Sequence, residues 1–116
     1  MNNFFRGQIF LWPFLLLISC TKDKSLEGKT AEEIKLINQG RKVYMTTCVV
    51  CHHPNPKLVG PTGPAIHGSS LELVTAKLLK GGYPKGYKPK RSTHLMPTFI
   101  EEHAKDVDAI HSFLNL

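Results

Sequence analysis

The chain has 116 residues, with 15 Lys and Arg against 9 Asp and Glu, which gives a formal net charge of +6. This length allows one small domain and excludes a multidomain enzyme. Half of the aromatic residues lie in the first 14 positions, so the remainder of the chain has few large apolar side chains with which to build a core.

The N-terminal segment has the layout of an export signal. Arg6 and the amino terminus precede an apolar run over residues 9–18, which is short for a helix that crosses a bilayer and makes a spanning anchor the weaker interpretation. The residues just before Cys20 resemble the bacterial lipobox, although Cys20 is alternatively an ordinary cysteine at the end of a signal. The lipobox reading predicts removal of residues 1–19 and lipid attachment to Cys20.

Residues 20–29 are polar and mixed in charge, and they are predicted to form a flexible tether. The predicted domain spans residues 30–116. Its first helix begins at Thr30, which forms a capping box with Glu33, and apolar side chains then recur at three- and four-residue steps. Gly40 interrupts this helix, which indicates that another backbone comes close at that point.

Two segments rich in proline and glycine, residues 53–69 and 83–99, show no regular period and are predicted to be loops. Loops of this length are uncommon in a small domain unless they are functional. They indicate that the domain encloses a large ligand.

Two further helical segments are predicted, one between these loops and one after them. Ser69 and Glu72 fit a capping box for a short helix that Gly81 ends. The last helical segment begins with Thr98 as its cap or nearer His103, and it runs to the C-terminus. The domain is therefore predicted to be all-α.

Cys48, Cys51 and His52 form the pattern Cys-x-x-Cys-His, the attachment signature for c-type haem. At the end of a helix both thiols can meet the two vinyl groups of one porphyrin edge while the histidine turns toward the iron. Two other interpretations of the cysteine pair are a redox-active dithiol and half of a zinc site. A redox-active dithiol would follow a β-strand, and a zinc site would need a second pair of ligands. Neither context is found in the sequence.

With this motif in place, residues 30–116 resemble the mono-haem class I cytochrome c family. Gly40 and Tyr44 match the family's first helix, and Ile110 and Phe113 match the C-terminal helix that crosses it. The resemblance implies an all-α cytochrome c fold, with three or more helices and long irregular loops around one covalently attached haem.

The resemblance also implies the surroundings of the iron. Pro64 would offer its carbonyl oxygen to the ring N–H of His52, the first axial ligand. The Leu-Met-Pro stretch around Met96 is similar to the distal-ligand loop, which makes Met96 the expected sixth ligand. His94 is the competing ligand, and Met45 is interpreted as a core residue.

The other histidines are not expected to bind iron. His53 follows the axial histidine and should point away from the iron, and His67 occupies a position of the Gly-Pro loop that does not face the iron in the family. His103 and His111 are placed on polar faces of the last helical segment.

The chain has no acidic residue between positions 73 and 100, and this stretch carries six basic residues. These form a candidate docking patch near the haem edge for an acidic redox protein, such as a reductase, an oxidase or a copper protein; a solvated loop with surplus lysines is the alternative. Tyr83 and Tyr87 among the lysines are typical of nucleic-acid binding, but no nucleic-acid partner is expected for an exported haem protein. The candidate patch consists of Lys77, Lys80, Lys85, Lys88, Lys90 and Arg91.

Together these features predict a one-electron carrier in the cell envelope, not an enzyme. It would be lipid-anchored to the inner or outer membrane, facing the periplasm, as a monomer or as the tethered subunit of a larger reductase or oxidase. The competing class is a haem enzyme or a gas or peroxide sensor, in which the sixth ligand of the iron is labile.

Overall fold

The computed structural model describes residues 22–116, so the predicted signal over residues 1–19 and the lipidation site Cys20 lie outside the described residues. The described part is helical and contains no β-strand, which confirms the predicted fold class. Within it, no helix has the length and apolar character needed to cross a membrane. Its elements are η1 (Lys24–Leu26), α1 (Ala31–Thr47), η2 (Cys48–Val50), α2 (Leu71–Thr75), η3 (Ala76–Lys80), α3 (Ile100–His103), η4 (Ala104–Asp106) and α4 (Val107–Leu114).

The first helix, α1, begins with the predicted capping box. The Thr30 hydroxyl accepts the backbone N–H of Glu33 at 3.2 Å, and the Glu33 carboxylate accepts the backbone N–H of Thr30 at 2.7 Å. These two bonds satisfy donors that a helix start would otherwise leave free. One face of α1 is buried, and it contains Ile37, Gly40 and Tyr44.

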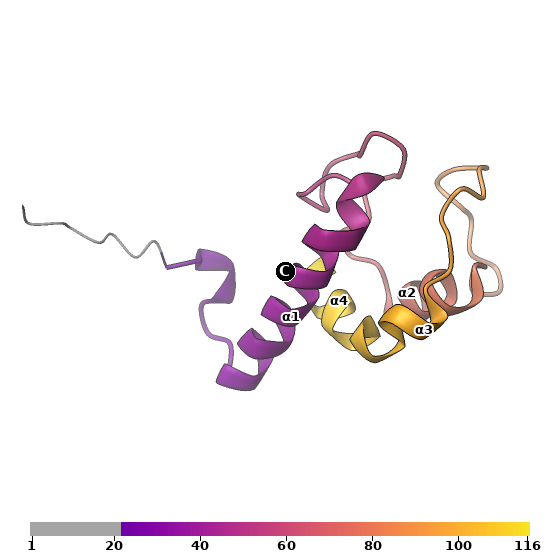
Figure 1. The fold of residues 1–116 in the computed structure, drawn as a ribbon. Coiled ribbons are helices and arrows are strands. Elements are labelled where there is room, and N and C mark those ends of the chain that lie inside the picture. The colour runs from indigo at the N-terminus through magenta and orange to yellow at the C-terminus, as the bar shows by residue number, and fades with distance from the viewer. Residues whose placement is uncertain (1–21) are drawn as a thin grey trace, which may run out of the picture.

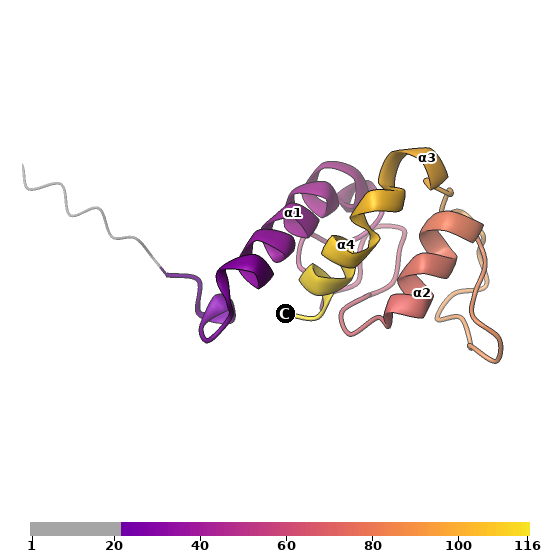
Figure 2. The same ribbon diagram turned by 90° about the horizontal axis from the view of Figure 1, so that it is seen from below.

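This buried face of α1 crosses α4, which lies between α1 and α2 (Figure 2). A Cβ atom on Gly40 would collide with the carbonyl of Ala109 and would lie 2.8 Å from the backbone nitrogen of Ile110. The rings of Tyr44 and Phe113 lie 5.2 Å apart between centroids at the same crossing. The predicted close approach at Gly40 is therefore confirmed, and α4 is the element that makes it.

We expect Gly40→Ala to lower the free energy of unfolding by about 1–3 kcal/mol, because the added methyl group has to push α1 and α4 apart. In a domain of this size, that loss corresponds to a fall of roughly 4–8 °C in Tm per kcal/mol. Thermal unfolding measures it. The matched control is Gly82→Ala, because nothing lies within 4 Å of a Cβ at Gly82. Equal Tm values for the two variants would contradict the crossing.

The hydrophobic core is small and draws on α1, α2, η3 and α4. Partly buried side chains from the loops, among them Ile66, Met96 and Phe99, pack against it. Because the loops supply part of the core, their conformation depends on the same packing as the helices. The buried residues of the core are Tyr44, Val74, Leu78, Val107, Ile110, Phe113 and Leu114.

The second helical segment, α2 followed by the π-helical turn η3, starts one residue later than predicted. Ser70 is its cap and accepts the backbone N–H of Leu73 at 3.2 Å. Ser69 instead donates its hydroxyl to the carbonyl of Ile66 at 2.6 Å, so the predicted capping box at Ser69 is wrong. The predicted stop is confirmed, since Gly81 follows η3 with a left-handed φ of 66° that favours glycine.

The third helical segment does not use Thr98 as its cap. Phe99 directly precedes α3 and makes no side-chain cap, while its backbone N–H donates to the carbonyl of Leu78 at 2.7 Å. The start of α3 is thus set by a bond to η3 and not by a local capping signal. The segment then bends through η4 before α4 begins.

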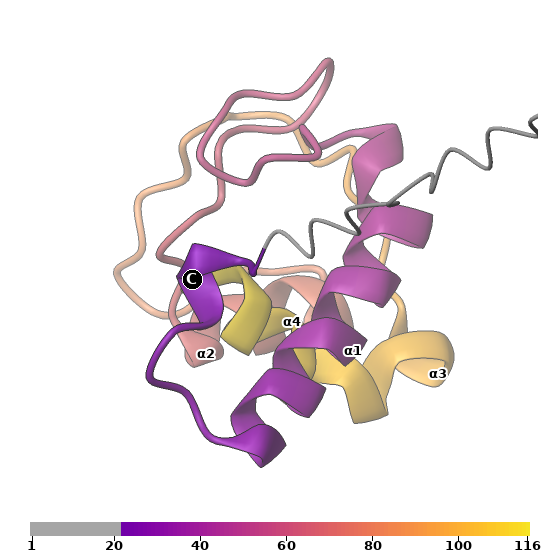
Figure 3. The ribbon, with the colours of Figure 1, turned by 90° about the vertical axis from the view of Figure 1, so that its left-hand side faces the viewer.

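Both predicted loops are confirmed as irregular over residues 53–69 and 83–99. Figure 1 shows them extending to the same side of α2, α3 and α4, and Figure 3 shows this arrangement from another direction. The candidate site described below thus lies between the loops and these helices.

The predicted tether contains a turn that contacts α1. Asp23 caps η1 and accepts a bond of 2.8 Å from the Arg41 guanidinium. Hydrogen bonds from Ser25 and Arg41 lower the pKa of Asp23 to about 2. Because Asp23 is bound to Arg41 of α1, only residues 20–22 of the predicted tether precede this contact.

Candidate functional site

A cavity of about 320 Å³ lies between the end of α1, the two loops, the α2–η3 segment and α4. Most of its lining side chains are apolar. All five residues predicted to bind the cofactor line it: Cys48, Cys51, His52, Pro64 and Met96. The fold therefore brings together residues from the end of α1 and from both long loops.

Cys48 and Cys51 are free, half-buried thiols at this cavity. The backbone N–H groups of Cys51 and His52 both donate to the carbonyl of Cys48, at 3.2 and 2.9 Å, so the chain turns tightly after α1. Burial raises the pKa of Cys48 to about 11, and the neighbouring Cys51 adds to this effect. The Cys48 thiol is therefore uncharged near neutral pH and lies against an apolar cavity.

His52 is buried, and its Nδ1 lies 3.0 Å from the Pro64 carbonyl oxygen. Because a carbonyl only accepts, Nδ1 carries the proton and Nε2 keeps a free lone pair. Burial lowers the pKa of His52, while the bond to Pro64 opposes this change. A neutral imidazole with a free Nε2 is the form that binds a metal ion.

Two glycines leave room for this histidine. A Cβ on Gly63 would collide with the His52 ring, and a Cβ on Gly60 would lie 2.6 Å from the His52 Cα. The Cys51 carbonyl accepts the N–H of Gly63 at 2.8 Å, which holds the loop in place. Gly60 is not among the predicted site residues, although a glycine in this loop is a signal for close backbone approach.

Met96 and His94, the two candidate sixth ligands, differ in their position. Met96 is half-buried, lines the cavity and packs against the core. His94 is exposed and is not among the lining residues found in the described part of the chain. Met45 is 42% exposed, so its interpretation as a core residue is wrong. It follows Tyr44 directly, and a helix turns consecutive side chains toward different faces.

Tyr44 connects α1 to the loop that carries the motif. Its ring is fully buried, and its hydroxyl donates to the carbonyl of His53 at 2.7 Å. Burial raises the pKa of Tyr44 to about 12, so the hydroxyl keeps its proton at neutral pH. The His53 ring is occupied elsewhere, because Nδ1 accepts the backbone N–H of Asn55 at 2.9 Å.

His103 lies in a different environment from the predicted polar face. It is 8% exposed and contacts Asp106, which in turn contacts Gln39 of α1. The prediction for His103 is wrong because the chain bends between α3 and α4, which turns this side chain inward.

The basic residues of the acid-free stretch fall into two groups. One group lines the cavity and consists of Lys77, Lys90 and Arg91. Here the Lys77 ammonium lies 4.3 Å from the ring centroid of Tyr83, and the Lys90 ammonium donates to the Ala65 carbonyl at 2.8 Å. The other group does not line the cavity and consists of Lys80, Lys85 and Lys88. These three side chains are exposed, as are Lys90 and Arg91 of the first group.

The donor set fits a covalently attached haem. Cys48 and Cys51 would hold the ring through two thioethers, and His52 would offer a neutral nitrogen to the iron. Met96, from the other loop, would offer a thioether sulfur. The apolar lining matches a macrocycle that has to be kept from water.

Comparison with known proteins supports this interpretation. A family model described as Cytochrome c matches residues 37–115. The match covers most of α1, the motif, both loops and α4. No curated protein sequence matches the chain significantly.

Proposed function

The chain belongs to the cytochrome c family and is a haem c electron-transfer protein, and we propose that it is an exported one-electron carrier with His52 and Met96 as axial iron ligands. One observation carries the ligand assignment: a single apolar cavity is lined by the attachment motif and by Met96, but not by His94.

The bound haem supplies the redox-active iron, and the chain supplies its ligands and surroundings. Pro64 fixes the orientation and the tautomer of His52, so that Nε2 is the donor nitrogen. A methionine sulfur raises the reduction potential relative to a second histidine. Because the same two side chains serve both oxidation states, electron transfer requires little rearrangement of the protein.

A redox titration followed by visible spectroscopy tests this proposal. The oxidised protein is expected to show the weak far-red absorption of a sulfur–iron bond, and reduction should abolish it. Nitric oxide or peroxide added to the protein should not change the spectrum quickly. Rapid binding of either molecule, without a far-red band, would favour the sensor or enzyme with a labile sixth ligand.

We also propose that residues 1–19 are a signal peptide and that Cys20 carries a lipid anchor. The support is the apolar run over residues 9–18, which ends just before Cys20, and the polar tether that follows Cys20. The contact between Asp23 and Arg41 would keep the domain close to the membrane, because it shortens the free part of the tether. The protein would then face the periplasm from the inner or outer membrane.

The proposed docking surface for a redox partner is the candidate patch of six basic residues: Lys77, Lys90 and Arg91 at the cavity, and Lys80, Lys85 and Lys88 outside its lining. All of them except the half-buried Lys77 are exposed, and they belong to segments that line or border the cavity. A positive surface beside the haem would attract a partner with an acidic surface and speed their encounter. The partner would be a reductase, an oxidase or a copper protein, and it would meet a free carrier or a subunit of a larger complex.

Reversing two of these charges should slow electron transfer. We expect Lys85→Glu combined with Lys88→Glu to lower the second-order rate with an acidic copper protein by about tenfold at low salt. The difference should shrink at high ionic strength, because salt screens exposed charges. Stopped-flow kinetics at several salt concentrations measures both effects.

The matched control is Lys24→Glu combined with Lys35→Glu, which changes the net charge equally at exposed positions on η1 and α1. If both double variants show the same loss of rate, net charge and not the docking surface is responsible.

A further inference from the structure

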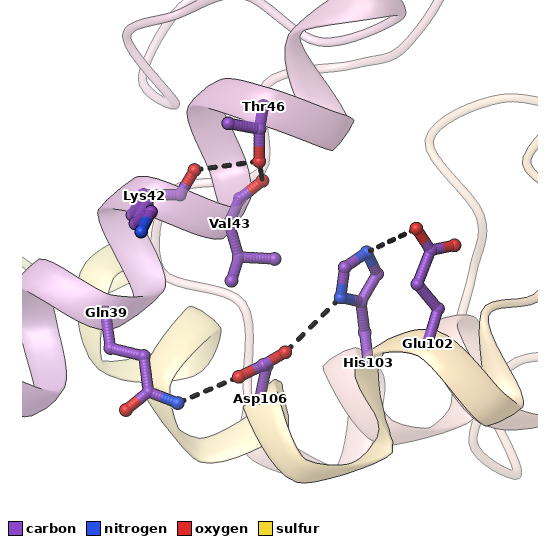
Figure 4. Close-up of polar contacts among 7 residues, drawn as sticks. All are labelled: Gln39, Lys42, Val43, Thr46, Glu102, His103 and Asp106. Carbon is purple, nitrogen blue, oxygen red and sulfur yellow. Dashed lines mark hydrogen bonds and ion pairs between the residues drawn. The ribbon is translucent and has the colours of Figure 1, made fainter.

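His103 and Asp106 are buried and form a polar cluster with Gln39 of α1 at the protein surface. Its side chain is 10% exposed, and its Nδ1 lies 3.3 Å from Oδ2 of Asp106. The other oxygen of Asp106 accepts the side-chain amide of Gln39 at 2.8 Å (Figure 4). A helix that the sequence places far from His103 thus helps to position its partner.

This arrangement determines where His103 can take up a proton. The bond from Gln39 is the largest effect that lowers the pKa of Asp106, so this carboxylate is ionised near neutral pH. A neutral His103 then donates Nδ1–H to Asp106, which leaves the lone pair on Nε2. Nε2 is buried and has no hydrogen-bond partner among the described residues.

Two carboxylates flank the His103 ring, Asp106 at Nδ1 and Glu102 on the side of Nε2. Glu102 Oε1 lies 3.9 Å from Nε2, and the Glu102 side chain is mostly exposed, so it lies between the imidazole and the protein surface. An imidazolium at this position would thus have one carboxylate beside each ring nitrogen. A proton on Nε2 would make this atom a donor, and the carboxylate of Glu102 is the acceptor beside it.

Basic residues lie on the surrounding elements. The positive charge of Lys105 of η4 contributes to the lowered pKa of Asp106. Lys42 lies on the turn of α1 above the cluster (Figure 4). The segment η3 contacts α3 and carries two further lysines. The Lys77 ammonium lies over the Tyr83 ring, and Lys80 is exposed. None of these four lysines forms an ion pair with Asp106 or Glu102 among the described residues.

The cluster is separated from the cavity by one aromatic ring. The His103 and Phe99 rings lie 5.5 Å apart between centroids, and Phe99 lines the cavity. Phe99 is held in place by its backbone bond to Leu78. Through such a layer of low dielectric, a charge on His103 acts on the cavity more strongly than it would through water.

We propose that His103 is a redox-linked proton-binding site, an inference that rests on the proposed carrier function. When one electron from the redox donor reduces the iron, His103 takes up a proton from solvent at Nε2, and an N–H bond forms. When the electron leaves, that N–H bond breaks and the proton returns to solvent. The coupling is reciprocal: a proton on His103 favours the ferrous state, and the ferrous state favours the proton.

NMR of the intact haem-loaded protein tests the proposal without any substitution. The His103 ring signals are followed against pH in the ferrous and in the ferric state. We expect the ferrous protein to bind the proton about fivefold more tightly or better, which appears as a titration midpoint at higher pH. Identical midpoints in the two states would overturn the proposal.

Potentiometry with variants gives a second readout. The wild-type midpoint potential should fall as pH rises through the range where histidine titrates, and His103→Gln should lose this part of the slope. Glu102→Gln should weaken proton binding about two- to threefold, because an exposed carboxylate contributes little. The matched control His67→Gln changes an exposed loop histidine and should keep the full slope.

The outcomes separate this proposal from the one on which it rests. A full slope retained in His103→Gln would overturn the linkage and leave the carrier function intact. A protein that is not reversibly reduced at any pH would overturn the carrier function itself, and the linkage with it.

Discussion

Replacing Cys48 and Cys51 together by serine should abolish covalent haem attachment. The two thiols line one apolar cavity beside His52, and a hydroxyl does not form the thioether that holds the ring. After denaturing gel electrophoresis, the double variant should show no haem-dependent peroxidase stain, while the wild type stains at its own mass.

The third cysteine of the chain provides the control. Cys20→Ser should retain the haem stain, because Cys20 is outside the attachment motif. The same variant tests the proposed anchor: it should move the protein from the membrane fraction to the soluble fraction. Loss of haem in Cys20→Ser, or a stained Cys48→Ser/Cys51→Ser protein, would contradict the assignment of roles to the three cysteines.

Replacing Met96 by alanine should remove the far-red absorption of the oxidised protein and lower its reduction potential. The physical reason is the loss of a sulfur ligand that favours ferrous iron. The decrease should be a substantial fraction of the roughly 0.8 V range that axial ligands span. The variant should also bind carbon monoxide in the ferrous state, since its sixth coordination position is open.

Two variants serve as controls for this prediction. His94→Ala removes the competing ligand, and Met45→Ala removes an exposed methionine on α1. Both should keep the far-red band and the wild-type potential. If His94→Ala changes the spectrum and Met96→Ala does not, His94 is the sixth ligand.

Features set by neighbouring residues were predictable from the sequence. The capping box of Thr30 and Glu33, the stop at Gly81 and the two irregular loops all depend on backbone preferences within a few positions. The Cys-x-x-Cys-His pattern is local too, because the chemistry needs two thiols and an imidazole within five positions. Gly40 also gave a signal of close approach, although it did not name the partner.

Features that depend on packing between distant segments were missed. Ser70 replaces Ser69 as a cap because the Ser69 hydroxyl bonds to Ile66 three residues earlier, and the preceding residue, Gly68, donates its backbone N–H to the Leu114 carbonyl of α4 at 3.1 Å. The start of α3 at Phe99 depends on a carbonyl of η3. In each case several local patterns were possible, and a backbone bond to a distant helical segment holds the chain just before the helix start.

The sequence alone determined the class of this protein: an all-α haem c domain with a covalent attachment motif and a cation-rich second loop. Only the tertiary structure decided which side chains meet. It placed Met96 and not His94 at the cavity, separated the basic residues that line the cavity from those that do not, and buried His103 against Asp106, which Gln39 helps to position. The reason is physical: motifs need only local spacing, whereas burial and charge environment arise from segments that folding brings together.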